Sequence, residues 1–231
     1  MLESLKKNFY LNFIKDDRYL WLVDGLKTTL IITLLAVVIG IVIGFLVAII
    51  RSTSDKSGKL PVLNAVCKVY LTVIRGTPTM IQLLIMNYVI FGSVRNVNKF
   101  LVGGLAFGIN SGAYVAEIVR SGIMSIDQGQ TEAGRSLGLN FTQTMRMIVL
   151  PQAFKNVLPA LVNEFIVLIK ETSIIGYIGM MDLTKGAMLI QSRTYNAFYP
   201  LLAAAVIYLA IVMILTFFMN KLERRLRTSE R

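Results

Sequence analysis

The chain has 231 residues, of which 55% are hydrophobic and 16% are charged, and its formal net charge is +11. So apolar a composition is typical of an integral membrane protein and excludes a disordered chain or a disulfide-linked scaffold. The sequence has no histidine and one cysteine, Cys67, so it lacks the residues for a histidine metal centre or a Ser-His-Asp triad, and we expect neither a catalytic nor a metal site.

The N-terminal segment, residues 1–25, precedes the first long apolar run. Aromatic residues cluster in its second half: Phe9, Tyr10, Phe13, Tyr19 and Trp21. Because aromatic rings favour the level of the lipid headgroups, we predict that this segment lies at the membrane interface. A membrane domain at 26–221 and a basic tail at 222–231 would follow it.

Five apolar segments follow in chain order: 28–50, 60–94, 100–119, 147–181 and 197–220. A helix needs about 20 apolar residues to cross roughly 30 Å of hydrocarbon, so each segment is long enough to span a membrane. The first and last contain no charge, whereas the other three are interrupted by charged residues. We therefore predict an all-α integral membrane protein with five transmembrane helices.

Small residues recur at four-residue spacing in two of these segments. They are Gly40 and Gly44 in the first, and Gly104, Gly108, Gly112 and Ala116 in the third. Such ridges allow helix backbones to approach closely in lipid. They predict either helix packing within the chain or a seam between two copies.

Between the third and fourth apolar segments, residues 120–150 form a polar stretch that is too long for a simple connection. Asp127 or Thr131 could cap a short helix within it. Gly138 would end that helix, because glycine accepts the left-handed conformation. A second helix would follow from Phe141. A short surface helix of this kind is suited to docking a cytoplasmic partner.

The distribution of Lys and Arg predicts the orientation, because short cytoplasmic loops are enriched in basic residues. Residues 51–59, 120–155 and 221–231 contain three, four and five basic residues, whereas 92–99 and 182–196 contain two each. We therefore expect the polar stretch and the C-terminus in the cytoplasm and the N-terminus outside. This sidedness accounts for the positive charge without nucleic acid as a partner.

The polar stretch also carries a family motif. It resembles the E-A-A signature of permease subunits of bacterial ABC importers in these residues: Glu132, Ala133, Gly134, Gly138 and Ile148 to Pro151. The third position, usually alanine in that signature, is glycine here. Four stretches sharpen the resemblance to the polar amino-acid branch: RGTPTMIQLL at 75–84, GAYVAEIVRSGI at 112–123, GQTEAGRSLG at 129–138 and LPQAFKNVLPALVNEFIVLIKETS at 150–173.

The resemblance implies the other parts of the transporter. Two permease subunits, identical or paralogous, would form the pore within the lipid of the bacterial inner membrane. A cytoplasmic ABC ATPase dimer would bind ATP and Mg²⁺, and an extracytoplasmic solute-binding protein would deliver the amino acid. The present chain has no GxxxxGK[ST] phosphate loop, so we expect it to bind no cofactor and to be no enzyme. The residues expected to couple it to the ATPase are Gly129, Glu132, Ala133, Gly134, Arg135 and Gly138.

Six residues of the apolar segments are candidates for the substrate pathway: Arg75, Gln82, Glu117, Asn163, Glu164 and Thr172. Charged residues inside membrane segments are costly and mark function. Arg75 could bind a carboxylate, and the neighbouring Gly76 and Pro78 could break the helix and free backbone groups. Glu117 and Glu164 could face the ammonium group, or either acid could form a structural ion pair with Arg75. The acids suit a cationic amino acid, and the amides suit a neutral polar one.

Two other function classes stay open on these residues. A secondary transporter or channel would move small solutes without an ATPase and would favour inverted repeats, which the sequence does not show. A membrane enzyme would need a catalytic cluster, for which carboxylates and lysines are the groups available. Neither class accounts for the four ordered matches to the permease family.

Overall fold

The computed structural model describes residues 2–228, and the regular structure in this range is entirely helical. The α-helices are α1 (Leu2–Phe9), α2 (Tyr19–Ser57), α3 (Pro61–Gly76), α4 (Thr79–Ile85), α5 (Lys99–Met124), α6 (Gln128–Ser136), α7 (Phe141–Thr144), α8 (Leu150–Glu171), α9 (Leu183–Thr194) and α10 (Phe198–Thr228). Short π- or 3₁₀-helical turns occupy Tyr10–Ile14, Lys15–Asp17, Met86–Ile90, Met145–Val149 and Thr172–Ile178. The expected all-α fold is confirmed.

Three helices of the described chain are long and apolar enough to cross a membrane: α2, α5 and α10. The bent pair of α3 and α4 is a fourth such segment if it counts as one crossing. Helix α8 has 22 residues, enough to span a bilayer, but it carries four charged residues: Lys155, Glu164, Lys170 and Glu171. The membrane character is therefore confirmed, whereas the count of five crossings and the sidedness of the termini stay predictions.

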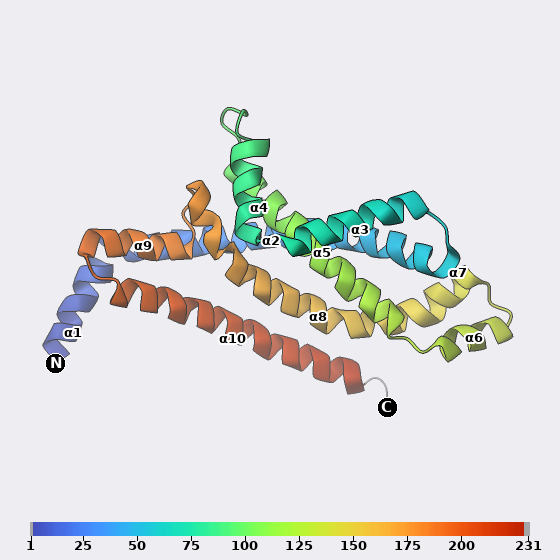
Figure 1. The fold of residues 1–231 in the computed structure, drawn as a ribbon. Helices are drawn as coiled ribbons and strands as arrows, with labels where there is room; N and C mark the ends of the chain where they lie inside the picture. Colours follow the sequence, from blue (N-terminus) through green and yellow to red (C-terminus); the bar gives the residue numbers. More distant parts are fainter. Residues whose placement is uncertain (1, 229–231) are drawn as a thin grey trace.

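The helices form an elongated molecule with distinct ends (Figure 1). Helices α2, α8 and α10 follow its long axis, and α5 crosses them obliquely. The polar hairpin of α6 and α7 lies at one end, whereas α1 and α9 lie at the other, and α4 stands out from the body. The polar hairpin is thus separated from the N-terminal segment by the full length of the membrane helices.

The ridges of small residues bring α2 and α5 together within the chain. A methyl group added at Gly108 would lie 2.7 Å from Ile39 Cβ, and one added at Gly40 would lie 3.1 Å from Ser111 Cβ. Larger side chains would therefore force the two helices apart, which is the reason for glycine at these positions. The structure confirms the packing interpretation of the ridges, and it leaves the alternative of a seam between copies untested.

The apolar segment at 60–94 is not one straight helix. Helices α3 and α4 are bent by 108° at a break that contains Thr77 and Pro78. Thr77 is extended, with φ −122° and ψ 147°, because a residue before proline is disfavoured in the helical conformation. The predicted break next to Arg75 is thus confirmed, and the expected single span is corrected to a bent pair.

Two segments expected to be loops are helical. Residues 182–196 contain α9, whose Leu183, Ala187 and Ile190 are buried in a cluster shared with α2 and α10. Their spacing of four and three residues places them on one face, and burial of that face supports a helix despite its polar residues. Residues 51–57, also expected in a loop, continue α2.

The boundaries expected at 25/26 and 221/222 coincide with no break in secondary structure, because α2 and α10 run through them. The interfacial position of residues 1–25 stays a prediction. Residue 1 and, within the basic tail at 222–231, residues 229–231 lie outside the described residues.

Candidate functional site

The polar hairpin has the caps that its sequence predicts. Asp127 caps α6 and accepts a hydrogen bond at Oδ1 from the Gly129 amide, at 2.7 Å. Gly138 follows the helix with a φ of +81°, a left-handed conformation that favours glycine. Asn140 then begins α7 with a reciprocal capping box to Gln143. Of the two expected caps, Asp127 is therefore the one used, and the predicted end at Gly138 is confirmed.

The expected coupling residues present a small, rigid surface. Gly134 is buried, and a methyl group there would lie 2.8 Å from Thr144 Cγ2, so the two helices of the hairpin touch at this position. Glu132 and Arg135 are exposed and line an open cavity of about 710 Å³ together with Phe141. Leu137, at the end of α6, is 80% exposed. The hairpin therefore offers charged and apolar groups to a partner while its own backbone is fixed by packing and caps.

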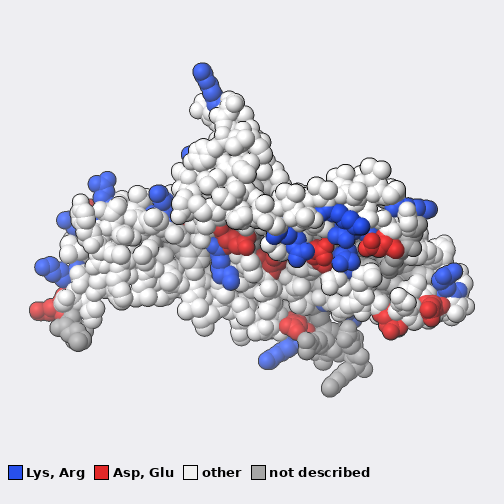
Figure 2. All heavy atoms as spheres, in the orientation of Figure 1, with Lys and Arg blue, Asp and Glu red and all other residues white. Residues whose placement is uncertain are grey.

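A second cavity, of about 630 Å³, lies where α3 faces α2 and α5. It is lined by Arg51, Lys68, Leu71, Thr72, Arg75, Gly76, Tyr114 and Glu117. The Arg75 guanidinium lies 5.6 Å from the centre of the Tyr114 ring, within the range of a cation–π contact. Figure 2 shows that most charged atoms of this face gather in one band below α3. The cavity therefore combines cations with an aromatic wall.

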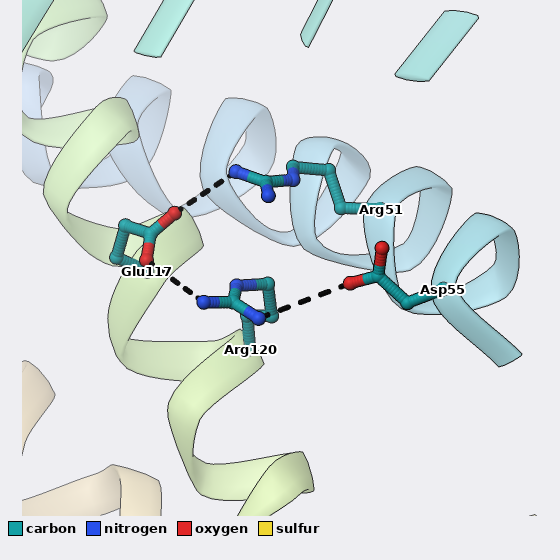
Figure 3. A network of polar contacts seen from close by, with 4 residues as sticks. All are labelled: Arg51, Asp55, Glu117 and Arg120. Carbon is teal, nitrogen blue, oxygen red and sulfur yellow. Dashed lines mark hydrogen bonds and ion pairs between the residues drawn. The ribbon is translucent and has the colours of Figure 1, made fainter. Parts of the chain in front are cut away.

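Glu117 is held by two arginines of the same region (Figure 3). Its Oε1 lies 3.1 Å from Arg51 Nη1, and its Oε2 lies 3.4 Å from Arg120 Nη2. Arg120 also lies 3.8 Å from Asp55, so the network joins the ends of α2 and α5. Within residues 2–228, Arg75 forms an ion pair with neither Glu117 nor Glu164. Arg75 and Lys68 thus enter the cavity without a carboxylate partner in the described chain.

The other four candidates lie outside this cavity. Ser111 donates a hydrogen bond to Glu164 Oε1 at 2.9 Å, which joins α5 to α8. Asn163 is exposed on α8, and Thr172 is fully buried, where its hydroxyl donates to the Ile169 carbonyl.

Gln82, the remaining candidate, uses its amide nitrogen within the chain. Its Nε2 lies 2.8 Å from the carbonyl oxygen of Ile74 and 3.0 Å from that of Thr77. The structure thus brings Arg75 and Glu117 into one cavity and separates the other candidates from it.

Sequence reasoning missed four polar or aromatic residues of the cavity: Arg51, Lys68, Thr72 and Tyr114. A signal for two of them was present. Lys68 and Thr72 precede Arg75 by seven and three residues, so all three share one helix face. Arg51 comes from α2 and Tyr114 from α5, and only the tertiary packing brings these to α3.

An all-helical membrane chain with a charged cavity between its helices and an exposed polar hairpin at one end is the transmembrane subunit of a transport system. Residues 40–228 match the family described as binding-protein-dependent transport system inner membrane component, and the chain belongs to this family. The comparison confirms the expected permease family and the inner-membrane location.

Named relatives support the amino-acid branch of this family. The chain is 41% identical over 183 residues to a putative glutamine transport system permease protein, GlnP, of Rickettsia bellii, with 73% of this chain and 83% of the relative covered. It is 42% identical over 165 residues to the arginine transport system permease protein ArtQ of Bacillus subtilis, with 70% and 74% covered. The expected resemblance to amino-acid ABC importer permeases is thereby confirmed.

Solved structures have the same fold. A crystal structure of an amino acid ABC transporter with histidines has a TM-score of 0.84 and 41% identity, and the match covers 92% of this chain and 98% of that one. The MetNI methionine ABC transporter in an inward-facing conformation has a TM-score of 0.72 at 22% identity, with 90% and 97% covered, which shows the fold alone.

Proposed function

We propose that this permease subunit forms the translocation pathway for a polar amino acid and that the cavity at Arg75 receives the carboxylate of the substrate. The observation that carries the proposal is the presence of Arg75 and Lys68 in one cavity without a carboxylate partner within residues 2–228. A guanidinium offers two parallel donors that match the two oxygens of a carboxylate. The break at Pro78 places Arg75 at the free end of α3, beside backbone that is not closed by helical hydrogen bonds.

The charge of the cavity favours a neutral or acidic side chain on the substrate. Its lining contains three cations, Arg51, Lys68 and Arg75, and one carboxylate, Glu117, which is already paired with Arg51 and Arg120. A cationic side chain would add to an unbalanced positive field in a site of reduced polarity. Among the substrates named for the relatives, glutamine fits this cavity better than arginine.

The transport energy would come from a partner. We assign ATP and Mg²⁺ binding to a cytoplasmic ABC ATPase dimer, with the α6 hairpin as its docking element. Glu132 and Arg135 are exposed for charged contacts, and Leu137 provides an apolar one. A second permease subunit, either a copy of this chain or a paralogue, and an extracytoplasmic solute-binding protein complete the proposed assembly.

The proposal is tested on the complex of this chain with its ATPase and binding protein, reconstituted in lipid vesicles. ATP-driven uptake of radiolabelled glutamine should exceed that of arginine. Arg75→Ala should raise the KM for glutamine about tenfold or more, the loss expected for one charge-assisted contact. The control is Arg193→Ala, which removes an exposed arginine at the end of α9, away from the cavity. A normal KM for Arg75→Ala would remove the cavity from the pathway.

Coupling has its own test. Glu132→Ala should reduce the stimulation of ATP hydrolysis by substrate-loaded binding protein, whereas Glu3→Ala, an exposed acid on α1 at the far end of the molecule, should not. Uptake that proceeds without ATP or without the ATPase subunits would contradict the importer and favour a secondary transporter.

A further inference from the structure

The bend between α3 and α4 leaves carbonyl groups at the end of α3 without partners in the helix. Gln82 supplies them from the first turn of α4. Its Nε2 lies 2.8 Å from the Ile74 carbonyl oxygen, 3.0 Å from the Thr77 carbonyl oxygen and 2.8 Å from Thr77 Oγ1. Ile74 and Thr77 flank Arg75 on either side. One side chain therefore fixes the backbone on both sides of the arginine.

Gln82 is itself fixed by α5. Asn110 Nδ2 donates a hydrogen bond to Gln82 Oε1 at 2.9 Å, and Asn110 is only 1% exposed. A second contact ties α3 to the same part of α5, since the Tyr70 hydroxyl donates to the Ile109 carbonyl at 2.6 Å. The amide of Gln82 is thus held between a buried donor on α5 and the acceptors at the end of α3.

The next turn of α5 completes the arrangement. Tyr114 follows Asn110 by four residues, so the two lie one above the other on the same face. The ring of Tyr114 receives the Arg75 guanidinium at 5.6 Å, while Asn110 acts on the backbone beside Arg75 through Gln82. One face of α5 therefore positions both the main chain and the side chain of Arg75.

We propose that Asn110 and Gln82 are positioning residues: they form an amide pair that sets the bend between α3 and α4 and so aims Arg75 into the cavity. This inference rests on the proposed function of Arg75 as the carboxylate receptor. It assigns Gln82 a structural contact with the bend in place of the substrate contact expected from the sequence, and it gives Asn110 a role in substrate affinity without contact to the substrate.

The first experiment measures ATP-driven uptake of glutamine by the reconstituted complex. Asn110→Ala and Gln82→Met should each raise KM about three- to tenfold, the effect of one lost hydrogen bond, and leave the maximal rate within about twofold. The double variant should be no worse than the single variants, because both act through one contact. In an Arg75→Ala background, Asn110→Ala should have no further effect on KM.

Asn12→Ala is a matched control. Asn12 is 2% exposed, it donates through Nδ2 to the Asn8 carbonyl, and its Oδ1 has no partner in the described chain, as is also the case for Asn110. It therefore reports the general cost of removing a buried asparagine, far from the cavity. An equal KM increase for Asn12→Ala, or an Asn110→Ala effect that persists without Arg75, would overturn the positioning role.

A second experiment needs no transport. In the complex with Cys67→Ser, the single native thiol is removed, and Arg75→Cys places a thiol at the position of interest. Adding Asn110→Ala should change the rate of modification of this thiol by a methanethiosulfonate reagent at least threefold, whereas adding Asn12→Ala should not. An unchanged rate would overturn the inference. If the unmodified complex shows no uptake of glutamine, the proposed function fails, and the thiol measurement still decides whether the amide pair aims residue 75.

Discussion

Glu117 sets the charge of the cavity, so Glu117→Gln is the most informative substitution in this chain. The change keeps the shape of the side chain but removes the only carboxylate of the lining, and the net charge of the lining rises from +2 to +3. It also breaks ion pairs of 3.1 Å with Arg51 and 3.4 Å with Arg120. The side chains of these pairs are 16–30% exposed, between a surface pair and a fully buried one. We therefore expect a loss of about 1–2 kcal/mol in the free energy of unfolding.

The functional consequence is a change in selectivity. With Arg51 released from its partner, uptake of glutamine by the reconstituted complex should become more sensitive to competition by glutamate and less sensitive to arginine, each by several-fold. Asp55→Asn is the matched control. It removes the other acid of the network, at 3.8 Å from Arg120, but Asp55 does not line the cavity. Asp55→Asn should therefore lower stability slightly and leave selectivity unchanged. Unchanged selectivity in Glu117→Gln, or an equal shift in Asp55→Asn, would refute the placement of the substrate in this cavity.

Packing of α5 and the shape of the hairpin are testable with single substitutions. Gly108→Ala places a methyl group 2.7 Å from Ile39 Cβ and should lower the unfolding free energy by about 1–3 kcal/mol, measured as a lower Tm in detergent, whereas Gly76→Ala, with no atom within 4 Å, should not; equal Tm values would contradict the packing. Gly138→Val forces a branched side chain into a φ of +81° and should reduce substrate-stimulated ATP hydrolysis; full stimulation would exclude a need for this turn. Leu137→Asp changes an 80% exposed side chain, so Tm should stay constant while co-purification of the ATPase falls about tenfold; undiminished co-purification would remove Leu137 from the docking surface.

The hairpin could be predicted from the sequence because its determinants are local. Asp127 caps a helix two residues away, and Gly138 ends it by its own backbone conformation. The break beside Arg75 was predictable for the same reason, since Pro78 acts on the residue before it. In contrast, the partner of Glu117 is 66 residues away on α2, and a charge in an apolar segment does not indicate which distant cation it meets. The sequence therefore allowed an ion pair with Arg75 that the fold does not make.

Gln82 and α9 show two other limits of the sequence. A polar side chain in an apolar segment can serve a substrate or a backbone group, and the choice of Gln82 depends on carbonyls that exist only because the helix bends. Helix α9 was expected as a loop because its charged residues, Lys185 and Arg193, outweighed its apolar face. The buried positions of that face are spaced for a helix, so the periodicity held information that the charge count concealed.

Helix α5 joins these features, because two patterns are written along it. Its small residues, among them Gly108 and Gly112, let α2 approach closely. On a different face, Asn110, Tyr114 and Glu117 hold the bend, receive Arg75 and close the ion network. A rigid helix transmits any shift of one face to the other, so a packing change on the small ridge must also move the groups around the cavity. Packing against α2 and the affinity of the proposed site are therefore coupled, and Gly108→Ala should raise the KM for glutamine as well as lower the Tm.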